Sequence, residues 1–565
     1  MTNTLRAAGL LLLAAFCCLT NAAAAPLPQN AEADKQAQRG AEYLSKKDWR
    51  RAADSYQKAL RADPRHVEAN YGIGLAYMNL ERGNEALAAF ANVIAAQPNP
   101  RVKEAFVYTG LIHYALKRYD EAGASLGRAA ALGDLGPGPH YYLGKVYQQQ
   151  GRDAEALASL RKATSEPQFA ADANLSVGFL LLKQNKPAEA ISPLEQAVRL
   201  GAQPLPVAQM FLGNAYVAVD RPAEGLAALR AADPNQLYTQ LGLGYAHLSL
   251  YRSEEAVAAF MAALRLQPAS PEAFVGLGNA YTRMTRYREA EDAFARALAA
   301  KADSAEALMG QAVLYYFQGQ YPKLVATAQQ AARLAPQNAG AQTLLGAALA
   351  TTGDMSGGLR ATREAARLEP ENYWPHHVLG FIFVREDKPR EALTEARTAV
   401  RLRPNDPGTQ NLLAYVLNQL GQHAEALQAA QAALQRKHEP ADEGWAHYNL
   451  ATAQEKLGRA EESRASYAAS IRAYNQPGRT LDPDDLYLMG NAYLRLEQDP
   501  AAVKAFQQAI KVRPNFAQAR YNLGVAYFAT GNRKGAQDEH NALRRLDPAR
   551  AAKLQAIISG KPGRN

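Results

Sequence analysis

The sequence predicts an all-α solenoid, a stack of about fifteen helix-turn-helix repeats that ends in a capping helix. Three observations carry this prediction. A small residue returns about every 34 residues, a second small residue follows it twelve positions later, and eight of the resulting units end in proline. Self-similarity at a fixed period of about 20–50 residues is typical of stacked repeat architectures. The repeat therefore decides the fold class, although a length of 565 residues would by itself indicate several ordinary domains.

The register of the repeat follows from the fragment Leu277-Gly278-Asn279-Ala280-Tyr281, in which Gly278 takes position 8 and Tyr281 position 11. Over residues 33–550, position 8 is glycine in twelve units and alanine in the other three. The glycines are Gly40, Gly74, Gly110, Gly144, Gly178, Gly213, Gly244, Gly278, Gly346, Gly380, Gly490 and Gly524. This pattern resembles the tetratricopeptide repeat, and the resemblance implies a right-handed superhelix over nearly the whole chain after the first 32 residues.

Each unit is expected to form two antiparallel helices, A and B. Small residues at positions 8 and 20 let the two backbones approach, and large residues at positions 7, 11 and 24 fill the space beside them. Proline at position 32 cannot continue helix B, so the chain turns into the next unit. One helix pair cannot bury its apolar face alone, but stacked pairs share a continuous core.

Irregular joints divide the predicted solenoid into three lobes. The unit at 206–236 is three residues short and ends at Asp233-Pro234-Asn235, and extra residues stand at 438–443 and 476–481. The predicted order is a signal peptide over 1–25, a linker over 26–32, lobes over 33–236, 237–440 and 444–550, and a capping helix with a tail over 551–565.

The first 25 residues have the features of a secretory signal. Arg6 supplies a positive charge, residues 7–19 form an apolar run, and residues 21–25 offer small side chains for cleavage. A run of 13 residues is too short for a membrane span, which needs about 20, and no later segment is long and apolar enough. Both cysteines, Cys17 and Cys18, lie in this run; Phe16 precedes them where a lipoprotein needs a small residue. We therefore expect a periplasmic protein, and a lipoprotein is the less favoured alternative.

The composition excludes several functional classes. With 63 Lys+Arg against 54 Asp+Glu, the charge of +9 is a small excess that calls for no nucleic-acid partner. Gly-x-Gly fragments recur at positions 6 and 8 of helix A without a preceding strand, which favours packing over dinucleotide binding. The pair His376-His377 lacks further ligands at metal spacing, and the repeats leave no room for a catalytic domain. We expect neither an enzyme, nor a metal, nor a cofactor.

The resemblance places ligand contacts at positions 2, 5, 9, 12 and 13 of helix A, which line the concave face. Asparagines at position 9 would bond a peptide backbone, and an arginine at position 13 would hold a carboxylate; the residues do not decide between this role and plain solvation. Aromatic side chains in the middle and later units are either core or binding surface. The predicted ligand-binding residues are Asn214, Asn279, Arg283, Asn491, Tyr245, Phe317, Trp374, His377, Phe381, Tyr415, Trp445 and Tyr448.

Two functions remain open at this point. The first is a non-catalytic periplasmic scaffold that binds a protein segment in the concave groove and supports envelope assembly, secretion or transport. The second is an accessory factor for exopolysaccharide handling or export, which the aromatic side chains from Tyr316 to Tyr448 favour. Self-association of the superhelix is possible in either case.

Overall fold

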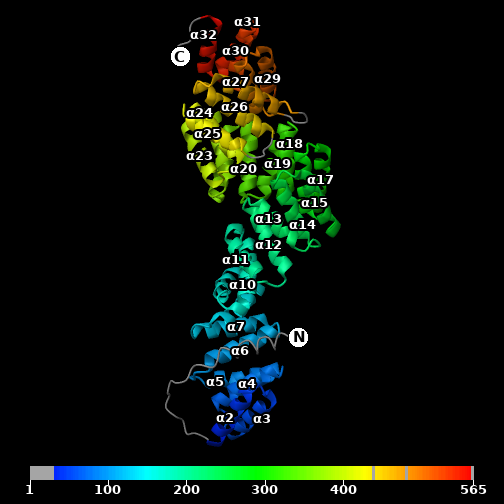
Figure 1. The fold of residues 1–565 in the computed structure, drawn as a ribbon, viewed down its shortest axis with the longest axis vertical. Helices are drawn as coiled ribbons and strands as arrows, with labels where there is room; N and C mark the ends of the chain where they lie inside the picture. The colour runs from blue at the N-terminus through cyan, green and yellow to red at the C-terminus, as the bar shows by residue number, and fades with distance from the viewer. Residues whose placement is uncertain (1–30, 436–439, 477–480, 561–565) are drawn as a thin grey trace. The chain divides into compact units, whose positions relative to one another are not determined.

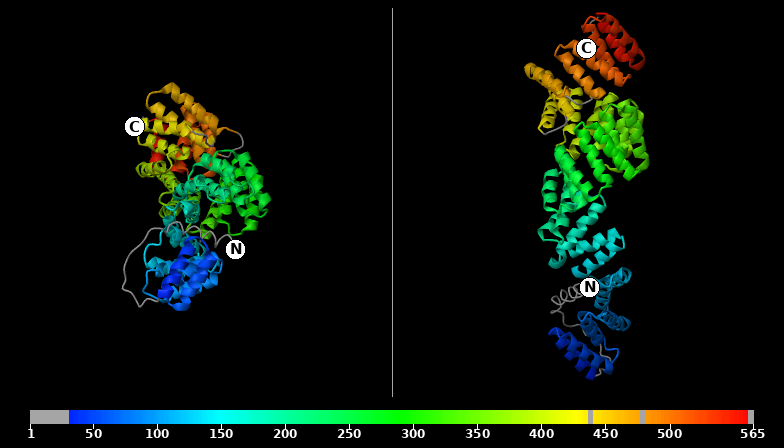
Figure 2. Two further views of the ribbon diagram at one scale, coloured as in Figure 1. Left: turned by 60° about the horizontal axis from the view of Figure 1, so that its bottom comes forward. Right: turned by 90° about the vertical axis from the view of Figure 1, so that its right-hand side faces the viewer.

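The computed structural model describes residues 31–435, 440–476 and 481–560, and within these ranges it contains 31 helices and no strand. The predicted signal peptide, most of the linker and both cysteines lie outside these residues. The chain divides after Pro234 into two compact units, which we call unit 1 and unit 2. In each unit the helices follow one another as antiparallel pairs, as Figures 1 and 2 show. The predicted all-α repeat solenoid is therefore confirmed.

Unit 1 contains six helix pairs. They are α2 (Ala31–Ser45) with α3 (Trp49–Ala62), α4 (Val67–Asn79) with α5 (Gly83–Ala95), α6 (Val102–Ala115) with α7 (Tyr119–Ala131), α8 (Pro137–Gln149) with α9 (Asp153–Ala163), α10 (Pro167–Lys183) with α11 (Pro187–Arg199), and α12 (Leu205–Ala218) with α13 (Pro222–Ala231).

Unit 2 contains nine pairs and a last helix. They are α14 (Leu237–Ser249) with α15 (Ser253–Leu266), α16 (Pro271–Arg283) with α17 (Tyr287–Ala300), α18 (Ala305–Phe317) with α19 (Tyr321–Leu334), α20 (Ala339–Thr352) with α21 (Met355–Leu368), α22 (Tyr373–Arg385) with α23 (Pro389–Leu402), α24 (Pro407–Gln419) with α25 (His423–Leu434), α26 (Pro440–Lys456) with α27 (Ala460–Tyr474), α28 (Pro483–Arg495) with α29 (Asp499–Val512), α30 (Ala517–Ala529) with α31 (Arg533–Leu546), and α32 (Pro548–Ile558).

The last helix, α32, buries Leu554 and Ala551 against the final repeat, beside Leu543. It thereby covers the apolar face that a next repeat would otherwise cover. The division after Pro234 falls two residues before the first predicted lobe boundary. The lobe limits themselves stay predictions.

The glycines of helix A make room for the aromatic ring at position 24. A methyl group at Gly278 would lie 2.6 Å from the Phe294 ring, and one at Gly310, position 6 of the next repeat, would lie 2.3 Å from the same ring. Phe294 is fully buried. The Gly-x-Gly fragments thus lie inside A helices and serve packing. The close backbone approach expected at position 8 is present at Gly213, where an added carbon would lie 3.0 Å from the Gly225 carbonyl oxygen.

The turn between helices A and B has one conformation in all fifteen repeats. Position 15 adopts a left-handed backbone every time: it is glycine in six repeats and another residue in nine. Thr285 is the β-branched member of the nine, with φ of 57°. Its side chain is exposed and touches no core. The left-handed region costs a side chain with a Cβ roughly 1–2 kcal/mol, and a β-branched residue is especially unfavourable there.

Replacing Thr285 with glycine is therefore expected to raise the free energy of unfolding of unit 2 by about 1 kcal/mol, since glycine adopts this conformation without steric cost. The reciprocal change Gly319→Thr, at the same position of the next repeat, should lower it by a similar amount, because Gly319 has φ of 68°. Urea unfolding followed by circular dichroism measures both. Shifts of the same sign in the two variants would contradict the assignment of strain to position 15.

Candidate functional site

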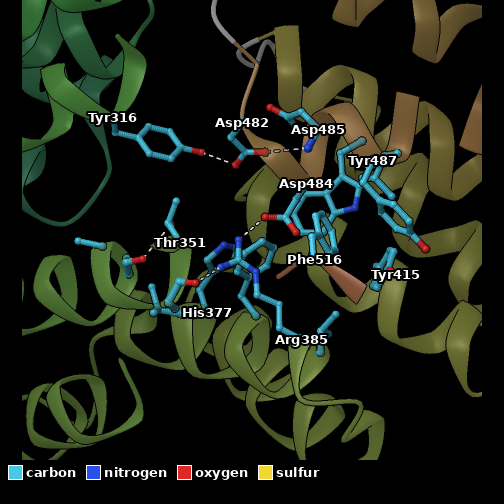
Figure 3. A pocket seen from close by; sticks show the side chains of 18 of the residues that line it. Tyr316, Thr351, His377, Arg385, Tyr415, Asp482, Asp484, Asp485, Tyr487 and Phe516 are labelled. Atoms are coloured by element: carbon cyan, nitrogen blue, oxygen red, sulfur yellow. Dashed lines mark hydrogen bonds and ion pairs between the residues drawn. The ribbon is translucent and has the colours of Figure 1, made fainter. Parts of the chain in front are cut away.

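The inner helices of unit 2 enclose a cavity of about 490 Å³, which we call the aromatic pocket. Its wall takes side chains from each A helix from α18 to α30. Figure 3 shows these side chains from close by, with α28 approaching from the opposite wall. Eight aromatic residues line the pocket: Tyr316, Phe317, Trp374, Phe381, Tyr415, Trp445, Tyr487 and Phe516.

Helix α22 contributes one continuous face. Trp374, His377, Phe381 and Arg385 follow at spacings of three and four residues, which place them on one side of an α-helix. The Phe381 ring meets the Trp445 ring edge-on, with centroids 6.1 Å apart and planes at 81°. Tyr415 lies 6.2 Å from the same tryptophan ring. Such tilted contacts are favourable between aromatic rings and fix their orientation.

Three charged side chains that lie far apart in the sequence form an ion cluster in unit 2. Asp484, in the first turn of α28, accepts two hydrogen bonds from the guanidinium of Arg513, at 2.6 and 3.1 Å. It also accepts a hydrogen bond from Arg385, 99 residues earlier. Both arginines donate in addition to the end of α20: Arg385 to the Ala350 carbonyl at 2.6 Å and Arg513 to the Thr351 carbonyl at 3.3 Å. We call Asp484, Arg385 and Arg513 the Asp484 cluster.

The Asp484 cluster is withdrawn from water. The side chains of Arg385 and Arg513 are 7% and 5% exposed, and that of Asp484 is 19% exposed. Burial alone would raise the pKa of Asp484, but the two guanidinium groups outweigh burial and lower the pKa to about 2. The carboxylate is therefore ionised at neutral pH. Two cations and one anion leave the cluster with one positive charge.

A second contact joins α18 to the start of α28. The Tyr316 hydroxyl donates to Asp482 Oδ2 at 2.6 Å, across 166 residues of sequence. Asp482 is also the N-cap of α28, where its Oδ1 accepts from the Asp485 backbone N–H at 2.7 Å. Burial raises the pKa of Tyr316 well above its usual range, so its hydroxyl stays a donor. Asp482 thus caps α28 and also holds the Tyr316 side chain in the pocket wall.

Three buried nitrogen atoms at the pocket have no hydrogen-bond partner among the described residues. They are Trp445 Nε1 and Arg385 Nε, which can only donate, and His377 Nδ1. Burial lowers the pKa of His377, so the imidazole is neutral at pH 7. Buried polar atoms are nearly always hydrogen-bonded in folded proteins. The wall therefore offers polar atoms that a ligand would satisfy.

The structure brings half of the predicted ligand-binding residues together. Phe317, Trp374, His377, Phe381, Tyr415 and Trp445 all line the aromatic pocket. Tyr448 lies beside it in α26 and packs edge-on against Tyr467, with centroids 5.7 Å apart. Tyr245 packs in the same way on Phe260, at 5.1 Å. These two rings belong to the interior of the repeats in this structure.

The predicted polar residues lie elsewhere. Arg283 donates to the Leu248 carbonyl at the end of α14 and lies over the Tyr251 ring at 5.5 Å. Asn491 accepts a hydrogen bond from Asn522 at 2.6 Å. Asn279 is half-buried in α16. Asn214 belongs to unit 1 and the others to unit 2. None of these four is part of the pocket lining.

Sequence reasoning missed the opposite wall of the pocket. Asp482, Asp484, Tyr487 and Phe516 all lie within residues 482–516, and Arg513 donates two hydrogen bonds to Asp484. The available pattern was the fragment Asp482-Pro483-Asp484-Asp485, which is typical of a helix start. That pattern predicts the N-cap, but it does not indicate that these aspartates contact Arg385 and Tyr316, which lie three and five repeats earlier in the chain.

Among the residues that the structure describes, no group of three His, Cys, Asp or Glu side chains is arranged to hold a metal ion. Over residues 31–435, 440–476 and 481–560, no helix combines the length and apolarity that crossing a membrane requires.

Fold and pocket together define an α-helical repeat solenoid with a concave inner surface. Models described as tetratricopeptide repeat match residues 43–105, 141–204, 178–240, 241–284, 275–339, 379–444 and 444–469, and one described as TPR repeat matches 490–531. The chain belongs to the tetratricopeptide repeat family, whose members act as protein–protein interaction scaffolds. The predicted family is confirmed.

No curated protein matches this chain. Among solved structures, a chain in the crystal structure of the APC/C hetero-tetramer Cut9–Hcn1 is similar, with 14% sequence identity and a TM-score of 0.49. The match covers 88% of this chain and 96% of the other.

Proposed function

We propose that the protein is an exported, non-catalytic adaptor of the periplasm. It binds a segment of a partner protein in the groove of unit 2 and supports envelope assembly, secretion or transport. One observation carries the binding site: a cavity of about 490 Å³ walled by eight aromatic side chains of successive A helices. Pockets of this size with a mainly apolar lining and a few placed polar groups are typical of ligand sites.

The structure supports a rigid mode of binding. The Asp484 cluster ties α22, α28 and the end of α20 together, so the two walls of the pocket are held before a partner arrives. A preformed site spends less of its binding free energy on ordering its own side chains. Aromatic side chains that bury a large area at low entropic cost are frequent anchors in protein interfaces.

Site-specific photo-crosslinking in envelope extract tests the proposal. A photoreactive phenylalanine analogue in place of Phe381 should crosslink a polypeptide, because Phe381 lines the pocket. The matched control carries the analogue in place of Arg288, an exposed residue of α17. Adding Trp445→Ala should reduce the Phe381 crosslink at least several-fold. Equal crosslinking from both positions, or none from Phe381, would remove the pocket from the proposed function.

An exopolysaccharide is the alternative occupant. The rings of Phe381, Tyr415 and Trp445 lie together in the pocket, and aromatic rings also pack against sugar rings. Protease treatment of the crosslinked material separates the two. A crosslinked partner that protease degrades is a polypeptide. A crosslinked partner that resists protease but is degraded by glycosidase would favour polysaccharide handling.

Export rests on the pattern of residues 1–25 alone. We expect the mature chain in the periplasmic fraction with an N-terminus near Ala25. Cell fractionation with N-terminal sequencing measures both. A chain that keeps Met1 and stays in the cytoplasm would contradict export, yet it would leave the binding site of unit 2 in place.

A further inference from the structure

Three nitrogen atoms of the aromatic pocket are buried without a hydrogen-bond partner among the described residues: Trp445 Nε1, Arg385 Nε and His377 Nδ1. The Arg385 side chain is only 7% exposed, and its other two nitrogen atoms are bonded to Asp484 and to the Ala350 carbonyl. An indole N–H and a guanidinium N–H can only donate, and a buried donor without an acceptor is costly. The pocket lining therefore favours a ligand that brings hydrogen-bond acceptors.

The unpaired atoms lie along one stretch of the wall. His377 and Arg385 are eight positions apart on the pocket face of α22, which corresponds to about 12 Å along the helix axis. Phe381 lies between them in the sequence, and the Trp445 ring meets the Phe381 ring edge-on at 6.1 Å. An extended peptide covers this length in about four residues, and each residue offers a carbonyl and, except for proline, an N–H. A short segment is thus long enough to reach from His377 to Arg385 with acceptors and donors along its backbone.

The charges of the lining are balanced within the protein. Asp482 adds a second anion at the start of α28, beside the Asp484 cluster, and both of its carboxylate oxygens accept hydrogen bonds. Arg550 lies 3.8 Å from Asp387. Asp442 and Asp485 also take part in interactions of their own. A charged side chain of a ligand would therefore give up its hydration in the pocket without meeting a free counter-charge.

Building on the proposed function, we infer that the aromatic pocket recognises an uncharged stretch of about four residues in the partner protein, in which a large apolar or aromatic side chain stands beside accessible backbone carbonyls. The apolar side chain packs on Phe381, Tyr415 and Trp445. One backbone carbonyl accepts a hydrogen bond from Trp445 Nε1 and another from Arg385 Nε. Lysine, arginine, aspartate and glutamate are excluded from this stretch, because the balanced charges of the pocket match a neutral segment.

Trp445→Phe tests the hydrogen bond while keeping an aromatic ring in the pocket. The substitution removes the indole N–H and leaves a ring that faces Phe381 and Tyr415. The matched control is Trp49→Phe, the same substitution in the first turn of α3 in unit 1, outside the pocket lining. Phe381→Ala removes a ring of the pocket and therefore shows which peptides bind there.

The first experiment selects displayed random twelve-residue peptides on the mature chain, with the Phe381→Ala variant as the counter-selection. We expect the enriched peptides to share a short stretch that contains phenylalanine, tyrosine, tryptophan or leucine and lacks charged residues. Placing lysine or glutamate in this stretch should each lower the affinity at least about tenfold. A charged residue common to the enriched stretch, of either sign, would overturn the inference.

The second experiment measures the fluorescence anisotropy of one enriched, labelled peptide. Trp445→Phe should lower its affinity about fivefold, and Trp49→Phe should leave it unchanged. Replacing one backbone amide of the peptide at a time with an ester weakens a single carbonyl as an acceptor. One of these esters should weaken binding to the unchanged protein but not to Trp445→Phe, because the two changes remove the same hydrogen bond. Equal losses with both proteins for every ester would show that Trp445 does not bind the peptide backbone.

The outcomes separate this inference from the proposed function. Enriched peptides that share a charge, yet bind through Phe381, leave the pocket a peptide site and overturn only the inference. Equal losses in the ester series have the same meaning. If the library yields no peptide whose binding depends on Phe381, both the inference and the peptide-binding function of the pocket are wrong.

Discussion

Asp484→Asn is expected to lower the free energy of unfolding of unit 2 by about 3–5 kcal/mol. The variant keeps the shape of the side chain but leaves Arg385 and Arg513 with two buried positive charges and no anion between them. Removing one partner of a buried ion pair costs about this much, because the remaining charge stays desolvated and unpaired. Here two like charges remain, and they also repel each other.

Tryptophan fluorescence during urea unfolding measures the effect. The chain has three tryptophans, of which Trp374 and Trp445 line the pocket, so a Trp49→Phe background makes the signal specific to unit 2. Asp303→Asn, an exposed aspartate in the turn before α18, is the matched control. A urea midpoint of unfolding as high as that of the control would show that the Asp484 cluster does not stabilise unit 2.

The pH dependence of the same transition has a definite sign. The pKa of Asp484 is lowered to about 2 from an ordinary value of 3.8. A lowered pKa gives stability that is fully present above the unfolded value and is lost as pH falls through the folded one. The shift corresponds to about 2 kcal/mol. The stabilisation from Asp484 is thus complete at neutral and mildly acidic pH. The unchanged protein should lose it between about pH 4 and pH 2, and Asp484→Asn should abolish this part of the pH dependence.

Gly72→Ala is expected to destabilise unit 1 by about 2 kcal/mol, although alanine is the better helix former. The added carbon would lie 2.2 Å from Tyr56 Cζ. The Tyr56 ring is 4% exposed, and its Cδ1 and Cε1 would lie only 2.7 Å from a carbon added at Gly40, so the ring is confined there as well. Overpacking of about 1–3 kcal/mol therefore outweighs the helix-propensity gain of about 1 kcal/mol.

Gly127→Ala is the matched control, because nothing lies within 4 Å of the added carbon in the middle of α7. It should stabilise unit 1 by about 0.5–1 kcal/mol. Tyr56→Leu should partly rescue Gly72→Ala, since Leu126 and Leu160 occupy the same repeat position in two other units. Trp49 alone, in a Trp374→Phe/Trp445→Phe background, reports the unfolding of unit 1. Destabilisation by both alanine variants would contradict the packing argument.

The repeat, the helices and their order can all be predicted from the sequence. Glycine at position 8, the large side chain at position 24 and proline at the end of a unit are local features, and they specify each helix pair from residues within one or two repeats. The role of Gly72 and Gly310 follows from the same pattern one repeat further on, where position 6 faces the ring at position 24 of the preceding unit. Phe317, Trp374, Phe381, Tyr415 and Trp445 were found from their place on helix A.

Which of these aromatic residues share a pocket, and which contacts join its walls, depends on the tertiary structure. The coil of a solenoid is the sum of small rotations between neighbouring repeats, and no single repeat encodes it. Asp484 is therefore hydrogen-bonded to Arg385, 99 residues away, and Tyr316 is hydrogen-bonded to Asp482, 166 residues away. The periodicity of the sequence predicts contacts between neighbouring repeats. The charged contacts of the pocket join repeats that are distant in the chain and come together only through the coiling of the stack.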